Sequence, residues 1–220
     1  MKTLHRTLMS VLATSAIVAS TSVSALPTGW VDGLPAWTAT ASSCSVDVSS
    51  TGKYEFANSQ FRYLGTNISS VSGFAPFFFP QPITVRCNVT PIYDYIYSPA
   101  DSSDVITIPA TVVAKSPSWN SLIVGYKDTD GISTKAQVTA SLKKISRATL
   151  GESTIATFNS NLTASVEAHE DVKTFNHTFD FQNNDYYVEI NLYRTDTSVA
   201  TPAAYSVRLA NGYFAAPPPQ

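Results

Sequence analysis

Apolar and polar residues alternate with a period of two along much of the chain, a pattern typical of β-strands with one solvated face. The clearest run covers 186–192, where Tyr, Val, Ile and Leu occupy every second position. Similar runs cover 83–89, 138–142 and 205–209. Because successive side chains point to opposite faces of a strand, each run predicts one buried and one polar face.

Turn-forming residues separate these runs. Residues 127–131 (Lys-Asp-Thr-Asp-Gly) have a turn composition, and the runs on either side predict a meander of hairpins that continues through 155–158. Aromatic residues at alternate positions of 175–181 predict a further strand. The short segment 164–172 is the one candidate for a helix, and its pattern is equally compatible with a loop.

About ten such strands in one chain, each with a single polar face, predict an all-β fold. We expect a single antiparallel two-sheet β-sandwich, jelly-roll-like in its connections, over residues 26–212. The Pro-rich stretch 213–220 is expected to be a disordered tail, since proline-rich segments stay extended.

The first 25 residues have the features of an export signal. Lys2 and Arg6 precede an apolar stretch at 8–19, and Val23-Ser-Ala25 supplies small residues at a cleavage site. A bilayer span needs about 20 apolar residues, so this stretch is too short, although an uncleaved anchor is the alternative. The pattern predicts a cleaved signal peptide at 1–25 and no membrane span afterwards. The protein would then be extracellular, or periplasmic if the host is a diderm bacterium.

The two cysteines fit that compartment. Cys44 and Cys87 each share strand parity with neighbouring apolar residues, so both sulfurs should face the core. An even count in an oxidising compartment predicts one disulfide between two strands. Two free buried thiols are the alternative.

Composition excludes several classes of protein. Only 14% of the residues are charged, against about 25% in average globular chains. The chain has 14 Lys and Arg residues against 16 Asp and Glu residues, and the basic residues form no continuous run. This argues against a nucleic-acid partner. Eleven Tyr, 11 Phe and three Trp argue against disorder. The 28 Ser and 25 Thr residues therefore supply much of the solvated surface.

The sequence lacks the patterns that mark common catalytic sites. It contains no Gly-x-Ser-x-Gly, and His169-Glu170 lacks the second histidine of a zinc protease motif. The carboxylates within predicted strands, Glu55, Asp180 and Glu189, fall on polar faces. We therefore expect a non-catalytic protein. A glycan-active hydrolase remains an alternative, because a sandwich can hold two opposed carboxylates.

Two stretches are candidates for binding. If Pro91–Pro99 is extended, then Tyr93, Tyr95 and Tyr97 project on one side. A tyrosine row suits carbohydrate, because each ring stacks on a sugar face while its hydroxyl forms hydrogen bonds. The alternatives are that these rings cover a sheet edge or are buried.

The second stretch is Asp128-Thr-Asp130-Gly131, which has the spacing of a calcium loop. It lacks a third ligand and a distal glutamate, so a solvated hairpin turn is the alternative.

These features favour a secreted protein that binds carbohydrate or another cell-surface ligand. The alternative is a structural or assembly protein of an envelope, coat or appendage, because few charged groups would need desolvation when hydroxyl-rich strands pack laterally.

Overall fold

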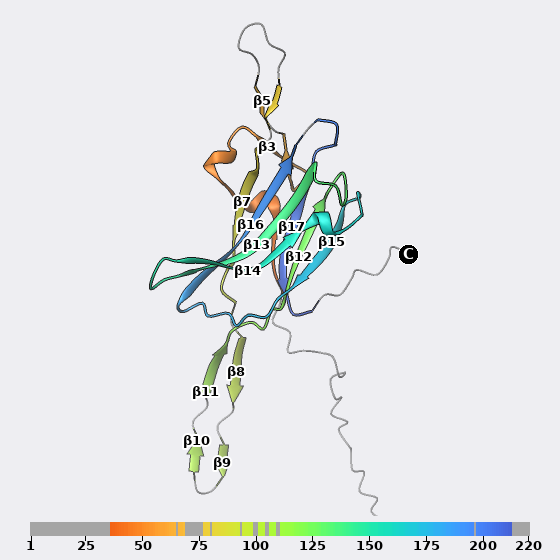
Figure 1. Ribbon diagram of the computed structural model, residues 1–220. Helices are drawn as coiled ribbons and strands as arrows, with labels where there is room; N and C mark the ends of the chain where they lie inside the picture. Colours follow the sequence, from red (N-terminus) through yellow and green to blue (C-terminus); the bar gives the residue numbers. More distant parts are fainter. Residues whose placement is uncertain are drawn as a thin grey trace, which may run out of the picture. The chain divides into compact units, whose positions relative to one another are not determined.

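The computed structural model describes residues 36–64, 66–68, 77–79, 81–92, 94–98, 101–103, 106–108, 111–195 and 197–212. Over this part of the chain the structure contains strands and three short 3₁₀ turns but no α-helix (Figure 1). The predicted signal peptide at 1–25 and the predicted tail at 213–220 lie outside the described residues. The 3₁₀ turns cover Ala41–Ser43, Val48–Ser50 and Ser160–Leu162.

The first large sheet is antiparallel and is built around β17, which pairs with β12 along one edge and with β1 and β4 along the other. β15 and β3 are its outer strands. Its strands are β1 (Trp37–Thr40), β3 (Tyr54–Ala57), β4 (Gln60–Tyr63), β12 (Ser121–Lys127), β15 (His169–Thr174) and β17 (Ala203–Ala210).

The second large sheet has the order β14-β13-β16-β7-β2 and is also antiparallel. Its two longest strands, β13 and β16, pair without interruption from Ala136 opposite Arg194 to Ser146 opposite Asn184. Its strands are β2 (Ser45–Val46), β7 (Ile83–Asn88), β13 (Ala136–Ser146), β14 (Glu152–Asn159) and β16 (Asn184–Arg194).

The inner faces of the two sheets form one hydrophobic core. In β13 the alternate residues Val138, Ala140 and Leu142 are fully buried, as the sequence pattern predicts. They belong to the same cluster as Val124 and Val207 of the other sheet. Each large aliphatic side chain removed from water stabilises the fold by about 1.5–3 kcal/mol. The predicted all-β, two-sheet antiparallel sandwich is confirmed, and its strand order is compatible with a jelly roll.

The predicted disulfide is also confirmed. Cys44, which immediately precedes β2, is bonded to Cys87 in β7, with the two Cα atoms 4.5 Å apart. Cys87 is buried in the core and Cys44 is partly buried against it. The bond therefore fixes the chain before β2 to the strand with which β2 pairs.

Three two-stranded sheets belong to neither large sheet. β8 pairs with β11, β9 with β10, and β5 with β6, all antiparallel. Their bounds are β5 (Thr66–Ile68), β6 (Phe77–Phe79), β8 (Asp94–Ser98), β9 (Asp101–Ser103), β10 (Ile106–Ile108) and β11 (Thr111–Lys115).

Three local predictions were wrong. β12, β13 and β14 do not form a meander, because β12 lies in the first sheet while β13 and β14 lie in the second. Residues 169–174 form β15 rather than part of a helix, because they pair with β12. Residues 175–180 have no strand pairing, although Phe179 is buried as its parity predicts. In each case long-range packing, and not the local sequence pattern, determines the backbone conformation and the strand pairing.

Candidate functional site

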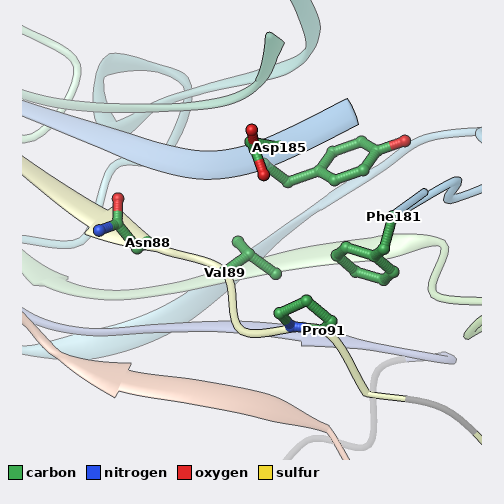
Figure 2. Close-up of a pocket in the computed structure, with 6 residues that line it drawn as sticks. Asn88, Val89, Pro91, Phe181 and Asp185 are labelled. Atoms are coloured by element: carbon green, nitrogen blue, oxygen red, sulfur yellow. The ribbon is translucent and has the colours of Figure 1, made fainter. Parts of the chain in front are cut away.

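A pocket of about 330 Å³ lies where β7 ends and the turn at 181–183 leads into β16 (Figure 2). Val89 and Phe181 are buried and form an apolar floor with the ring of Tyr186. The rim residues Asn88 and Asp185 are exposed. This size lies at the small end of the range for ligand pockets. The lining residues are Asn88, Val89, Pro91, Phe181, Asp185 and Tyr186.

Strand pairing places the two halves of the pocket together. Asn88 is opposite Tyr187 in the β7–β16 ladder. The N–H of Val89 then donates to the carbonyl oxygen of Tyr186 at 2.9 Å, which extends the pairing one residue beyond β7. Pro91 has no N–H to continue a ladder, so the chain can turn away at the pocket.

Asp180 organises the turn that positions Phe181. Its Oδ1 accepts the N–H groups of Gln182 and Asn183 at 3.0 and 3.2 Å, and its Oδ2 accepts the Asn183 side chain at 2.8 Å. Hydrogen bonds from Asn183 hold the pKa of Asp180 below its usual value. This carboxylate has a structural role in the turn.

Tyr186 is fixed by a small polar network beneath the pocket. Its hydroxyl oxygen accepts the Asp180 N–H at 2.9 Å and lies 3.2 Å from Nε2 of His177. Burial raises the pKa of Tyr186 and lowers the pKa of His177. The Tyr186 ring also lies 5.1 Å from the Phe181 ring, centroid to centroid. The floor is therefore pre-formed.

The rim of the pocket carries polar groups that are able to form hydrogen bonds. Arg147 binds Asp185 with two contacts, Nη2 to Oδ1 at 2.6 Å and Nε to Oδ2 at 3.2 Å. This ion pair holds the pKa of Asp185 below its usual value. The Asn88 carboxamide adds hydrogen-bond donors and an acceptor. In Figure 2 the Phe181 ring lies near Pro91 and Val89, whereas the Asn88 and Asp185 side chains are farther from it.

The predicted tyrosine row is only partly within the described chain. Tyr93 lies outside the described residues, and for Tyr95 and Tyr97 the structure describes the backbone of β8 but not the side chains. A role for these rings therefore stays a prediction. In the sequence Pro91, which lines the pocket, precedes Tyr93 by two residues.

The carboxylates of Asp128 and Asp130 both accept hydrogen bonds from other residues of the protein. Asp128 is fully buried and accepts the hydroxyl of Ser160, and burial raises its pKa to about 6. Asp130 Oδ2 accepts the N–H groups of Lys135 and Ala136 at 2.8 and 3.0 Å. No group of three or more His, Cys, Asp or Glu residues suited to a metal occurs in the described part of the chain. The calcium site stays a prediction.

The structure also places charges together in a way that the sequence does not predict. On the outer face of the second sheet, Arg86 of β7 binds Glu189 of β16, with Nε and Nη2 both 2.9 Å from Oε2. Arg86 also binds Asp47. The pKa of Asp47 is strongly lowered, first by hydrogen bonds from Ser49 and then by Arg86.

Lys143 of β13 continues this series. Its Nζ lies 3.0 Å from Oε1 of Glu189 and 2.9 Å from Oε1 of Glu152. The hydroxyl of Tyr187 donates to Glu152, and burial followed by this hydrogen bond raises the pKa of Tyr187 to about 12. We call these residues the charge chain: Asp47, Arg86, Glu189, Lys143, Glu152 and Tyr187.

The charge chain contains two neighbouring carboxylates, Glu152 and Glu189, but Glu152 lacks the property of a general acid. A general acid needs a raised pKa so that it can protonate the leaving group. Hydrogen bonds from Tyr187 and Lys143 instead lower the pKa of Glu152. Lys143 also binds both carboxylates. The arrangement is suited to stabilising the sheet face.

Among the described residues no helix is long and apolar enough to cross a bilayer. No protein-family model matches the chain, and no curated protein matches it.

Proposed function

We propose that the protein is a secreted, non-catalytic binding protein whose ligand is a carbohydrate of a cell surface. The pocket of Val89, Phe181, Asn88 and Asp185 holds one sugar ring. The observation that carries the proposal is this combination of a pre-formed apolar floor and a polar rim in a volume of about 330 Å³.

The chemistry of a sugar ring matches that combination. A pyranose presents C–H groups on its faces and hydroxyls around its edge, so it needs an apolar surface beside paired donors and acceptors. The Asn88 carboxamide and the Asp185 carboxylate supply both kinds of polar group, and Arg147 orients Asp185. Tyr93, Tyr95 and Tyr97 would add stacking surface for further sugar units.

Export is supported by two independent features. The Cys44–Cys87 disulfide is typical of oxidising compartments. The charged, apolar and small-residue pattern of 1–25 is typical of a signal peptide.

Affinity electrophoresis of the secreted protein in gels containing soluble polysaccharides tests the proposal. We expect at least one polysaccharide to retard the wild type. The double variant Asn88→Ala and Asp185→Asn should weaken retention at least tenfold, a loss of about 1.4 kcal/mol. Glu55→Gln is the matched control, because it disrupts a similarly exposed ion pair with Arg62 on the first sheet.

Retention that is equal in the double variant and the wild type would place the ligand elsewhere and contradict this site. Failure of every polysaccharide to retard the wild type would contradict carbohydrate binding itself. Triple replacement of Tyr93, Tyr95 and Tyr97 by alanine should weaken the retention of the protein by long polysaccharides. The same replacement should have a smaller effect on the affinity for a monosaccharide, measured by calorimetry.

A further inference from the structure

β8 and β11 form a two-stranded antiparallel sheet. Between them in the chain, β9 and β10 form a second antiparallel pair. We call these four strands the ribbon. Within the described chain, neither β8 nor β11 is hydrogen-bonded to a strand of the two large sheets. Each therefore has one edge whose backbone donors and acceptors have no strand partner, and such edges are templates for pairing with another chain.

These edges carry little of the usual protection against pairing. Natural edge strands carry lysine, proline or bulges that block a further strand. The charged residues of β8 and β11 are Asp94 and Lys115, at one end of the pair, and residues 95–98 and 111–114 contain no charged residue and no proline. Their register is regular, from Asp94 opposite Lys115 to Ser98 opposite Thr111.

We propose that the ribbon is a dimerisation element, in which the outer edge of β8 pairs antiparallel with β8 of a second copy of this chain. A two-fold axis at Ile96 sets Ile96 opposite its own copy. It sets Tyr95 opposite Tyr97 of the second copy, and Asp94 opposite Ser98. This register places no two like charges opposite each other. Opposed like charges would destabilise the pair of strands.

A second copy completes what the ribbon lacks. Two strands alone are marginally stable in water, whereas three or more strands form a stable sheet. Pairing through β8 creates a four-stranded sheet with the order β11-β8-β8-β11. Pairing through β11 about Val113 would set Val112 opposite Ala114, and such pairs stabilise a sheet less than the tyrosine pairs at β8.

Dimerisation has a consequence for binding, although the inference does not depend on the proposed function. Directly opposed residues of an antiparallel pair share a face, and so do residues two apart in one strand. Tyr95 and Tyr97 of both copies would therefore lie on one face of the four-stranded sheet. Two sites joined in this way bind a polymer more tightly than one.

The test uses the full secreted chain. Sedimentation equilibrium should give twice the monomer mass for the wild type. In Ile96→Cys, oxidised glutathione should convert most of the protein to a disulfide-linked dimer, because directly opposed Cα atoms are about 4.5–5.5 Å apart. Val113→Cys, at the position opposite Ile96 in the same ribbon, is the matched control and should cross-link at least tenfold more slowly.

Charge reversal tests the register. Tyr95→Lys with Tyr97→Lys should yield monomers, as should the same pair of changes to glutamate, and an equimolar mixture should restore a heterodimer. A monomeric wild type at millimolar concentration would overturn the inference. Faster cross-linking of Val113→Cys than of Ile96→Cys, or a mixture that stays monomeric, would overturn the β8 pairing. None of these readouts uses a glycan, so they are independent of carbohydrate binding.

Discussion

Lys143 and Glu189 form an ion pair on the outer face of the second sheet, with Nζ 3.0 Å from Oε1, although only 17% and 13% of their side chains are exposed. Lys143 also neutralises Glu152. Replacing Lys143 by Met leaves two neighbouring carboxylates without their shared cation. We expect urea denaturation to show that the free energy of unfolding falls by about 1–3 kcal/mol. This loss lies between those measured on breaking exposed and buried ion pairs.

Lys173→Met is the control for that loss, since Lys173 is an exposed lysine of β15 and its replacement should change stability by less than about 0.5 kcal/mol. Adding Glu152→Gln to Lys143→Met should recover part of the loss, because it removes the carboxylate that Lys143 neutralises and leaves Glu189 paired with Arg86. Equal stability of the two lysine variants would contradict a stabilising role for the charge chain.

Gly131 lies in the loop after β12 with φ +63°, and a Cβ built on it would lie 2.9 Å from the carbonyl oxygen of Ala164. Gly52 has a similar φ of +78° but nothing within 4 Å of its Cβ position. Gly52→Ala therefore measures the backbone cost alone, about 1 kcal/mol. Gly131→Ala should cost about 1–2 kcal/mol more, because the backbone around Ala164 must shift. Equal melting temperatures of the two variants would contradict this close contact.

Local alternation predicts the parts of the fold that depend on one strand at a time. Val138, Ala140 and Leu142 face the core because each strand buries one face, and the sequence contains that information. In β12 the pattern fails because Ile123 is buried on the face opposite Leu122 and Val124. Its neighbours there are Arg208 and Val172 in the adjoining strands, which are distant in the sequence.

The candidate site depends on such long-range neighbours. Asn88 and Asp185 line the same pocket because β7 pairs with β16, and the register of that pairing cannot be read from either strand alone. The same holds for Arg86, whose partners Asp47 and Glu189 lie 39 and 103 residues away in the chain. Sequence patterns predict that these residues are on polar faces, whereas strand order decides which of them touch.

Asp128 should make stability depend on pH. Its pKa is about 6 in the folded protein against an ordinary 3.8, so the folded state binds the proton more tightly than the unfolded state. Protonation therefore stabilises the fold as the pH falls from 7 to 4, by about 2 kcal/mol over this range. Asp128→Asn cannot titrate and should lack this contribution.

The measurement is the difference in unfolding free energy between wild type and Asp128→Asn, recorded in EDTA from pH 4.5 to 7.5. As the pH falls, the unfolding free energy of the wild type should rise relative to that of the variant. This difference isolates Asp128 from His177, whose lowered pKa has the opposite effect in the same range. Asp180→Asn is the control: the pKa of Asp180 is lowered, so its stabilisation is lost only as the pH falls below its ordinary value. A constant difference for Asp128→Asn would contradict the raised pKa.

The Cys44–Cys87 bond should contribute a large part of the stability of the sandwich. It closes a loop with a sequence separation of 43, which in the chain-entropy model stabilises the fold by about 4 kcal/mol. Replacing both cysteines by alanine should lower the urea midpoint, whereas reductant should lower the midpoint of the wild type and not that of the variant. Because β2 has only two residues, its pairing with β7 should be the first to open without the bond. The N–H of Asp47, the residue after β2, donates to the carbonyl oxygen of Thr84 in β7 at 2.9 Å. Hydrogen exchange at Asp47 should then accelerate far more than at Val138 in β13, and equal acceleration at both sites would show that the bond acts on the whole fold instead.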